Sequence, residues 1–232
     1  MALLAAALVF GLWYPYPYRE ISGGRELFFI IVAVDVVMGP LLTFAVFNRK
    51  KPLKELKRDL GVIVLLQLAA LGYGLWTVFL ARPVHLVYEY DRFRVVHAVE
   101  IDTELLPKAL PTLQTLPITG PTTLSLREFK SGKEQGDLTM AALGGVQLSA
   151  QPELWQGYSL AAKSVLAQAK PVAVLKSRFA AQSAQIDAAV LSTGRAESAL
   201  RFVPMVARKD FWTVLVDATT AQPAAFIPID SF

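Results

Sequence analysis

LFFIIVAVDVVMGPLLTFAVF, at residues 27–47, is the stretch of this sequence that decides how the chain is organised. Of its twenty-one residues, only Asp35 carries a charge. A helix of this length rises about 30 Å, which is the thickness of the hydrocarbon core of a bilayer. The sequence therefore predicts a transmembrane helix with two unusual features, Asp35 and the Gly39-Pro40 step.

Two further apolar stretches flank this segment. Residues 1–14 are apolar but would rise only about 21 Å as a helix. They lack a basic leading region, and the aromatic residues 13–18 follow them in place of a small-residue cleavage site. We therefore predict a short first membrane helix, with a truncated start, rather than a signal peptide. Residues 60–80 are again uncharged, so the sequence predicts a membrane domain, 1–81, of three transmembrane helices at about 1–14, 27–47 and 60–80.

The charges between these stretches predict the topology. Six basic residues lie between positions 48 and 58, whereas the loop from 15 to 26 has only Arg19 and Arg25, offset by two glutamates. Cytoplasmic loops are enriched in Lys and Arg, so we expect the loop 48–59 and the N-terminus to be cytoplasmic. Residues 82–232 then form a domain on the periplasmic face of the membrane.

The composition excludes several classes of function. Of the 23 Lys and Arg and the 19 Asp and Glu, eight and five lie in residues 1–81, which leaves a nearly neutral 82–232. A nucleic-acid-binding domain would need a basic stripe, so we expect no nucleic-acid partner. The chain has no cysteine, which excludes disulfides and thiolate metal sites.

The segment after residue 82 opens with a predicted β-hairpin of strands 84–90 and 93–99. A two-residue turn would pair residue i with residue 183−i, and hence Glu89 with Arg94, a favourable cross-strand pair. This register also gathers apolar side chains on one face, namely those of Leu86, Tyr88, Tyr90, Phe93 and Val95.

The rest of the domain alternates between helical and extended patterns. Residues 103–123 are punctuated by prolines, with at most a short helix near 104–110. Helix-like patterns cover 159–168 and 172–191, and strand-like patterns cover 199–207, 211–217 and 224–229. Strands that flank a helical middle predict an α+β domain with a mostly antiparallel sheet.

Catalytic and metal-binding patterns are absent from the sequence. The only histidines are His85 and His97, and the predicted register directs their rings to opposite faces of the sheet, which disfavours a shared metal site. No HExxH, Walker loop, GxSxG or SxxK motif occurs. We therefore expect a protein that is not an enzyme and that needs no cofactor or metal.

The polar residues of the predicted spans are the candidate interaction site. Asp35 would lie about 12 Å into the membrane, level with Tyr73 of an antiparallel third span. Gln67 would lie nearer Gly39-Pro40, where the proline frees one backbone carbonyl of the preceding turn. These groups could hold two helices of this protein together, or they could contact a helix of another protein, and both could be true.

Several motifs carry a resemblance to a known family, and they cover roughly residues 11–100. They are Trp13-Tyr-Pro-x-Pro17, Arg25-Glu-Leu-Phe28, Asp35-x3-Gly39-Pro-Leu-Leu-Thr43, Phe47-Asn-x-Lys50, Arg58-Asp-Leu60, Gln67-x5-Tyr73-Gly-Leu-Trp76 and Asp91-Arg-Phe-Arg-Val95. Together they resemble the type IV pilin accessory protein family (TfpX/TfpZ). The resemblance implies an inner-membrane, non-enzymatic assembly factor or chaperone for a cognate type IV pilin in a Gram-negative bacterium. Members of that family have a longer and more basic N-terminus than this chain.

The resemblance suggests how such a protein could meet its client. A pilin before assembly has a hydrophobic helix in the membrane and a globular head outside it. We expect the membrane domain to contact the helix, within the lipid bilayer, and the periplasmic domain to contact the head. The alternative is an extracytoplasmic sensor or envelope scaffold that binds a small ligand through its α+β domain. A sensor would need a cytoplasmic output module, and the predicted cytoplasmic segments contain none.

Overall fold

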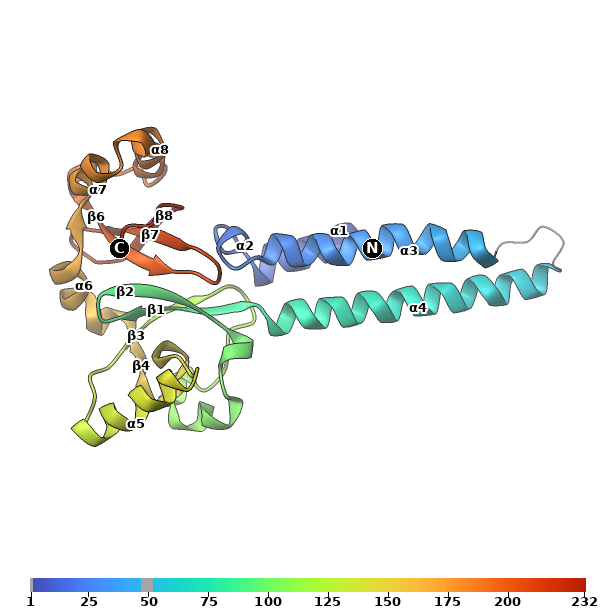
Figure 1. The fold of residues 1–232 in the computed structure, drawn as a ribbon, viewed down its shortest axis with the longest axis horizontal. Helices are drawn as coiled ribbons and strands as arrows, with labels where there is room; N and C mark the ends of the chain where they lie inside the picture. Colours follow the sequence, from blue (N-terminus) through green and yellow to red (C-terminus); the bar gives the residue numbers. More distant parts are fainter. Residues whose placement is uncertain (1, 47–51) are drawn as a thin grey trace. The chain divides into compact units, whose positions relative to one another are not determined.

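The computed structural model of this protein describes residues 2–46 and 52–232. At helical positions 2, 34, 35, 38, 45, 46 and 53 it describes the backbone alone. The chain divides into two compact units, Met1–Arg82 and Pro83–Phe232. Figure 1 shows the first as a set of long helices and the second as a sheet with shorter helices around it.

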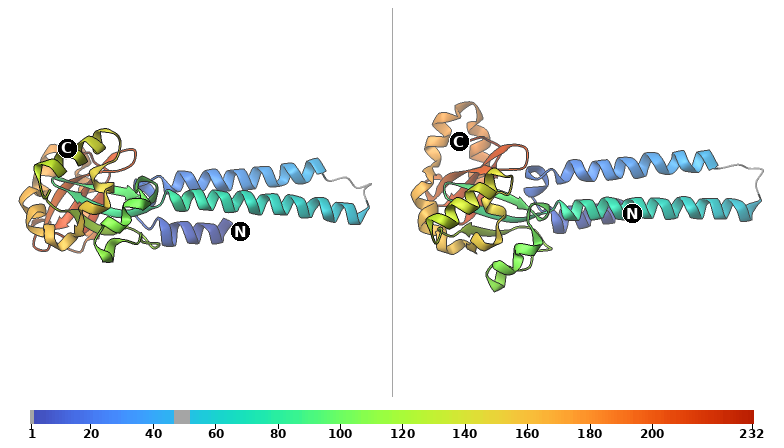
Figure 2. Two further views of the ribbon diagram at one scale, coloured as in Figure 1. Left: turned by 90° about the horizontal axis from the view of Figure 1, so that it is seen from below. Right: turned by 60° about the horizontal axis from the view of Figure 1, so that its bottom comes forward.

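The first unit is helical. Its elements are α1 (Ala2–Leu8), which continues as the π-helical turn η1 (Val9–Trp13), α2 (Tyr18–Ile21), α3 (Gly24–Val46) and α4 (Leu53–Leu80). Pro15 and Pro17 end the first helical segment, because proline has no amide hydrogen to donate. Gly23 then supplies the positive φ, +69°, with which the chain turns into α3. Both views of Figure 2 show α3 and α4 running side by side.

Tyr14 lies at the centre of the packing in this unit. Its side chain is fully buried, and its hydroxyl donates a hydrogen bond to the Val78 carbonyl of α4, at 3.1 Å. Its ring lies against Gly24, where a Cβ atom would come within 2.9 Å of three ring carbons. Apolar side chains from all three segments surround it, including Ala5, Val9, Phe28, Val32 and Leu75. The first helical segment is thereby held against α3 and α4.

The prediction of three transmembrane helices is wrong. Among the described residues, a single helix, Lys54–Leu80, is long and apolar enough to cross a membrane. The first apolar segment, Leu3–Trp13, would span only about 16 Å. The second predicted span coincides with α3, which has Arg25 and Glu26 in its first turn. The structure therefore supports one candidate membrane anchor and not the predicted multi-pass arrangement.

The second unit is an α+β domain built on a mixed sheet of eight strands. The strands follow the order β4-β3-β1-β2-β6-β7-β8, and β5 pairs with β6. Two pairings, β1 with β3 and β2 with β6, are parallel, and the other five are antiparallel. The strands are β1 (Pro83–Glu89), β2 (Arg92–His97), β3 (Thr122–Leu126), β4 (Trp155–Gly157), β5 (Lys170–Pro171), β6 (Leu200–Val206), β7 (Phe211–Asp217) and β8 (Pro223–Ile227).

Short helices connect these strands. The α-helices are α5 (Gly132–Leu143), α6 (Ala162–Gln168), α7 (Val172–Arg178) and α8 (Ser183–Ser192). The 3-10 turns are η2 (Ala98–Glu100), η3 (Thr103–Lys108), η4 (Pro111–Leu113), η5 (Leu148–Ala150), η6 (Pro152–Leu154), η7 (Tyr158–Ala161), η8 (Ala180–Gln182) and η9 (Glu197–Ala199). The predicted helix 172–191 is interrupted at Phe179, whose backbone leaves the helical region and separates α7 from α8.

The core of this domain includes two hydrophobic clusters at opposite ends of the sheet. The first packs around Trp155 and comprises residues such as Val84, Val87, Val96, Leu124 and Leu154. The second packs α7 and α8 against the other end of the sheet and comprises residues such as Leu175, Ile186, Leu200, Leu215 and Ile227. Further buried residues lie between them, including Phe93, Tyr158 and Met205.

The register of the first hairpin differs from the prediction. Residue i pairs with residue 181−i, so Tyr88 faces Phe93 and Glu89 faces Arg92. The two-residue turn is therefore Tyr90-Asp91 instead of the predicted Asp91-Arg92, and one strand is shifted by two residues along the other. Arg94 still reaches Glu89, with Nε 3.0 Å from Oε2, but it does so diagonally. An even shift leaves every side chain on its expected face, so the apolar pattern alone could not distinguish the two registers.

Candidate functional site

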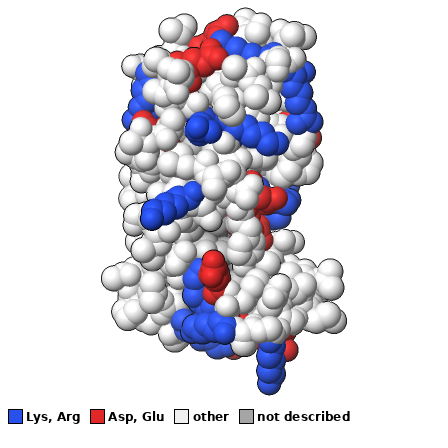
Figure 3. Space-filling model, turned by 90° about the vertical axis from the view of Figure 1, so that its left-hand side faces the viewer, with Lys and Arg blue, Asp and Glu red and all other residues white. Residues whose placement is uncertain are grey.

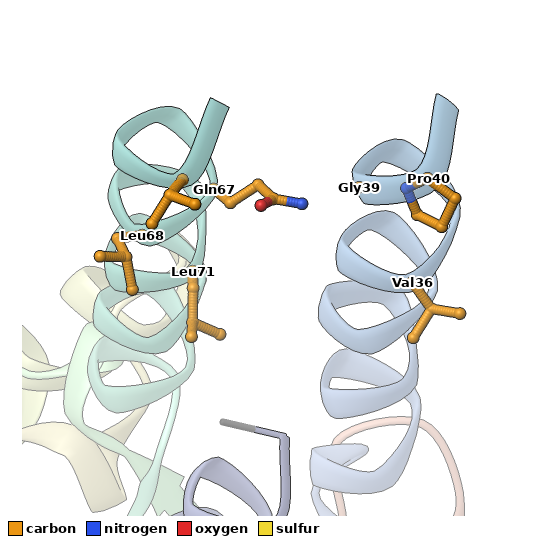
Figure 4. Close-up of a pocket in the computed structure, with 7 residues that line it drawn as sticks. Val36, Gly39, Pro40, Gln67, Leu68 and Leu71 are labelled. Carbon is orange, nitrogen blue, oxygen red and sulfur yellow. The ribbon is translucent and has the colours of Figure 1, made fainter. Parts of the chain in front are cut away.

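The structure brings two of the predicted site residues, Gly39 of α3 and Gln67 of α4, into close contact. A Cβ atom at Gly39 would collide with the Gln67 amide nitrogen and would lie 3.7 Å from its Cδ. Figure 4 shows the Gln67 side chain extended from α4 toward α3 at the level of Pro40. A side chain at position 39 would displace the Gln67 amide from this position, which its flexible side chain permits.

A groove opens between the two helices at this level. Its volume is about 590 Å³, and its lining is apolar except for the amide of Gln67 (Figure 4). The lining residues are Val36, Gly39, Pro40, Val64, Gln67, Leu68 and Leu71. A single hydrogen-bonding side chain in an apolar groove can orient a helix that enters it, because a polar group in hydrocarbon gains from finding a partner.

Pro40 and Thr43 shape the α3 side of the groove. Pro40 lies inside the helix and has no amide hydrogen, so the carbonyl four residues earlier loses its helical donor. One turn later, the Thr43 hydroxyl donates to the Gly39 carbonyl at 2.9 Å. This type of hydrogen bond within a helix satisfies a hydroxyl that would otherwise face an apolar surrounding.

Of the other two predicted site residues, Tyr73 is not among the described residues that line the groove. The Asp35 side chain lies outside the described part of the structure, and so does its predicted contact with Tyr73. The Tyr73 side chain is 75% exposed. Next to it, Gly74 packs against Ile31 of α3, where a Cβ would lie 2.9 Å from Cγ1. Small residues of α4 therefore allow the two helices to approach closely.

The surface and the charges of α4 fit a membrane environment. Its exposed side chains between residues 60 and 80 are uncharged, and most are large and apolar, such as Leu65, Leu66 and Trp76. Basic residues Lys54, Lys57 and Arg58 lie in the first two turns, before the uncharged stretch begins. The remaining basic residues of the predicted loop 48–59, at 49–51, lie outside the described residues.

In the second unit, the two histidines have different surroundings. His85 is buried against the Trp155 ring, and its Nδ1 lies 2.7 Å from the Thr122 hydroxyl. Burial lowers the pKa of His85 to about 4, so its ring is neutral at physiological pH. His97 instead has its Nδ1 3.0 Å from a carboxylate oxygen of Glu100. Within the described residues, no three His, Asp or Glu side chains are grouped in a way that could hold a metal ion.

A polar pocket at the tip of the first hairpin was not predicted from the sequence. Its volume is about 170 Å³, and residues of five secondary-structure elements and two loops line it: Tyr88, Tyr90, Leu126, Glu128, Gln156, Leu160, Ala161 and Ser164. These residues are far apart in the sequence, and no motif joins them. On the face drawn in Figure 3, basic and acidic side chains are interspersed among uncharged ones.

Comparisons with known proteins give full-length relatives. A family model described as fimbrial assembly protein FimB matches residues 1–23. The chain is 37% identical over 235 residues to the fimbrial assembly protein, serogroup I, of Dichelobacter nodosus, which covers all of this chain and 91% of that protein. The serogroup E1 protein of the same organism is 36% identical with the same coverage. The protein of serogroups C1 and C2 is 45% identical over 109 residues, which are 47% of this chain and 83% of the relative. No solved structure matches the chain.

Proposed function

Because this chain belongs to the family of fimbrial assembly proteins, we propose that it is a non-enzymatic, membrane-anchored accessory protein that assists a type IV pilin during fimbrial assembly. The family membership carries this proposal, since the relatives cover the whole chain. The motifs of residues 11–100, which resemble a pilin accessory family, support the choice of a pilin as client. Assistance here means keeping the pilin intact and available before it enters the fimbria.

The anchor in this proposal is α4, set in the inner membrane. Its residues Lys54–Leu80 would extend about 40 Å, which exceeds the hydrocarbon thickness of a bilayer. The basic residues at its start favour the cytoplasmic side for that end. The α+β domain, which begins at Pro83, then lies on the periplasmic side, where the head of a membrane-held pilin would also be.

The groove beside Gln67 is the proposed contact for the hydrophobic helix of the pilin. An apolar groove between two helices accepts the apolar face of a third helix, so a helix is the form in which a segment of the pilin would enter this groove. The apolar lining of Leu68 and Leu71 matches such a helix, and the Gln67 amide offers it one polar contact. The periplasmic domain would act on the head of the same pilin.

Site-specific photocrosslinking in cells tests this proposal. A crosslinker at Leu68 or Leu71, inside the groove, should capture the pilin, whereas one at Leu66, which is exposed on α4 but does not line the groove, should capture much less. A Gly39→Leu variant should lose the capture, because its side chain fills the groove. Gly61→Leu is the matched control, since a Cβ there meets nothing within 4 Å.

The possible results separate two failures. If the pilin is captured equally from Leu66 and from the groove, and Gly39→Leu changes nothing, then the groove is not the contact. If no position on the helices or on the periplasmic domain captures a pilin, and deletion of the gene leaves pilin level and fimbriae unchanged, then the proposed function is wrong.

A further inference from the structure

Tyr90 at the tip of the first hairpin has a strained backbone. Its φ is +61°, and the Asp91 amide donates a hydrogen bond to the Glu89 carbonyl across it, at 2.7 Å. A three-residue turn with positive φ is rare and costly for a residue that has a side chain. Strain of this kind is concentrated at functional sites, where the surrounding structure holds it in place. A glycine would fit this position without strain, yet the chain has a tyrosine here.

The strained turn forms one wall of the polar pocket at the hairpin tip. The Tyr88 hydroxyl donates to the Tyr90 carbonyl at 2.5 Å and so fixes the turn from inside. On the outer side, the Tyr90 ring lies 6.0 Å from the Phe129 ring, measured between centroids. Two tyrosine rings therefore border a space of about 170 Å³, which is several times the volume that one water molecule takes in the liquid.

The polar groups that line the pocket can accept hydrogen bonds. The Gln156 amide nitrogen already donates to the Leu126 carbonyl at 3.2 Å, which leaves its carbonyl oxygen as an acceptor. Ser164 adds an exposed hydroxyl. Glu128 adds a carboxylate whose side chain takes part in no ion pair or hydrogen bond within the described residues.

Two arginines near the pocket are paired with other glutamates. The Arg127 guanidinium makes two hydrogen bonds to Glu134, at 2.7 and 3.1 Å, and a third to the Glu153 carbonyl. Arg94 is paired with Glu89 at 3.0 Å. Glu128 is thus an unneutralised carboxylate beside aromatic rings, and no cationic side chain lines the pocket.

We propose that this pocket binds the ammonium group of a lysine side chain presented by a protein partner. An ammonium has three donors, which match the Glu128 carboxylate, the Gln156 carbonyl and the Ser164 hydroxyl. Cations are also attracted to the faces of aromatic rings, which the two tyrosines provide. The pocket is small enough to suit a compact point charge on an apolar stem rather than the wide fork of a guanidinium. This inference does not depend on which protein is the client.

Titration of the full-length protein in detergent with N-acetyl-lysine methylamide tests the proposal, with ring-labelled tyrosine signals followed by NMR. The signals of Tyr88 and Tyr90 should shift and saturate. N-acetyl-norleucine methylamide, which has no ammonium, should shift neither signal, and the arginine analogue should bind more weakly than the lysine analogue.

Variants make the test specific. Glu128→Gln keeps the shape of the side chain, and it should weaken binding about tenfold or more, because it removes the charge from the main acceptor. Tyr90→Gly removes one ring and relieves the strained φ, so the protein should remain folded while binding weakens. Glu104→Gln, an exposed glutamate on η3 away from the pocket, is the matched control and should bind as the wild type does.

Three results would overturn the proposal. The first is no saturable shift with the lysine analogue, and the second is an equal shift with the norleucine analogue. The third is an affinity for the lysine analogue that is unchanged in both Glu128→Gln and Tyr90→Gly. Loss of binding in Glu128→Gln with wild-type binding in Glu104→Gln would support it.

Discussion

Replacing Gly24 with alanine should destabilise the helical unit, because the new methyl group would enter the space of the Tyr14 ring. A Cβ at position 24 would lie 2.6 Å from Cγ and 2.9 Å from Cε1 of Tyr14, and closer still to Cδ1. The ring cannot move freely, since it is fully buried and its hydroxyl donates to the Val78 carbonyl.

The expected cost follows from these contacts. Overpacking of a rigid, buried neighbour costs about 1–3 kcal/mol. If the ring shifts to relieve the contact, its hydrogen bond of about 1 kcal/mol is weakened instead. Alanine has the better helix propensity, by up to about 1 kcal/mol, but Gly24 is the first residue of α3, where little of that gain is realised. We expect a net destabilisation of about 1–3 kcal/mol.

Equilibrium unfolding in detergent measures this cost, with the fluorescence of Trp13 and Trp76 as the probe, because both lie in the helical unit. The matched controls are Gly61→Ala and Gly72→Ala, which add the same methyl group to α4 where nothing lies within 4 Å. Both should be neutral, or more stable by up to about 1 kcal/mol.

A double-mutant cycle decides whether the ring is the cause. In a Tyr14→Ala background, the ring is gone, so Gly24→Ala should cost nothing further, and the coupling energy should equal the cost of the collision. A Gly24→Ala variant whose stability lies within about 0.5 kcal/mol of the wild type would show that the new methyl group does not crowd the Tyr14 ring. Equal costs in the two backgrounds would show that the ring is not the cause of the destabilisation.

Three further predictions concern the α+β domain. Burial lowers the pKa of His85 to about 4, so between pH 6.5 and 4 this residue binds more protons in the unfolded state than in the folded state. The free energy of unfolding should therefore fall as the pH is lowered from 6.5 to 4. His85→Phe should flatten this dependence when unfolding is measured as a function of pH. Hydrogen bonds from the Arg127 guanidinium hold the pKa of Glu134 at about 2. Stability should therefore be lost as the pH falls from about 4.5 to 2, and acid titration of Glu134→Gln should not show this loss. The Lys176 ammonium contacts the carboxylates of Asp187 and Glu197, at 2.5 Å each. Lys176→Met should therefore lower the melting temperature, measured by calorimetry, more at low salt than at high salt.

The sequence predicted which segments of the first unit are helical better than it predicted how many of them cross the membrane. The relatives confirm the resemblance to a pilin assembly family at the level of fimbrial assembly. Three transmembrane helices were inferred from apolar length alone, and the structure supports one, α4. The first segment ends after Trp13, close to the predicted end at residue 14. Apolar length could not reveal that this segment packs beside α3 and α4, because that depends on the Tyr14 and Gly24 contact.

In the α+β domain, local patterns predicted strands more reliably than pairings. The predicted strand 211–217 matches β7. The parallel contact of β2 with β6 joins residues more than a hundred positions apart, for which the sequence contains no local signal. The pocket beside Tyr90 was missed for the same reason, since four separate stretches of the sequence, 88–90, 126–128, 156 and 160–164, line it.

The short contact between β2 and β6 has a consequence for how the domain forms. Among the β-ladder partners, only two residue pairs, Phe93 with Met205 and Arg94 with Val206, join the two halves of the sheet. The strands of one half come from residues 83–157 and those of the other from residues 170–227. Most strand pairings therefore form within one contiguous segment, whereas the buried Phe93 and Met205 side chains and the hydrogen bond from the Tyr158 hydroxyl to the Ala221 carbonyl need both segments. Amide hydrogens along β2 and β6 at their junction should exchange with solvent earlier than those inside either half.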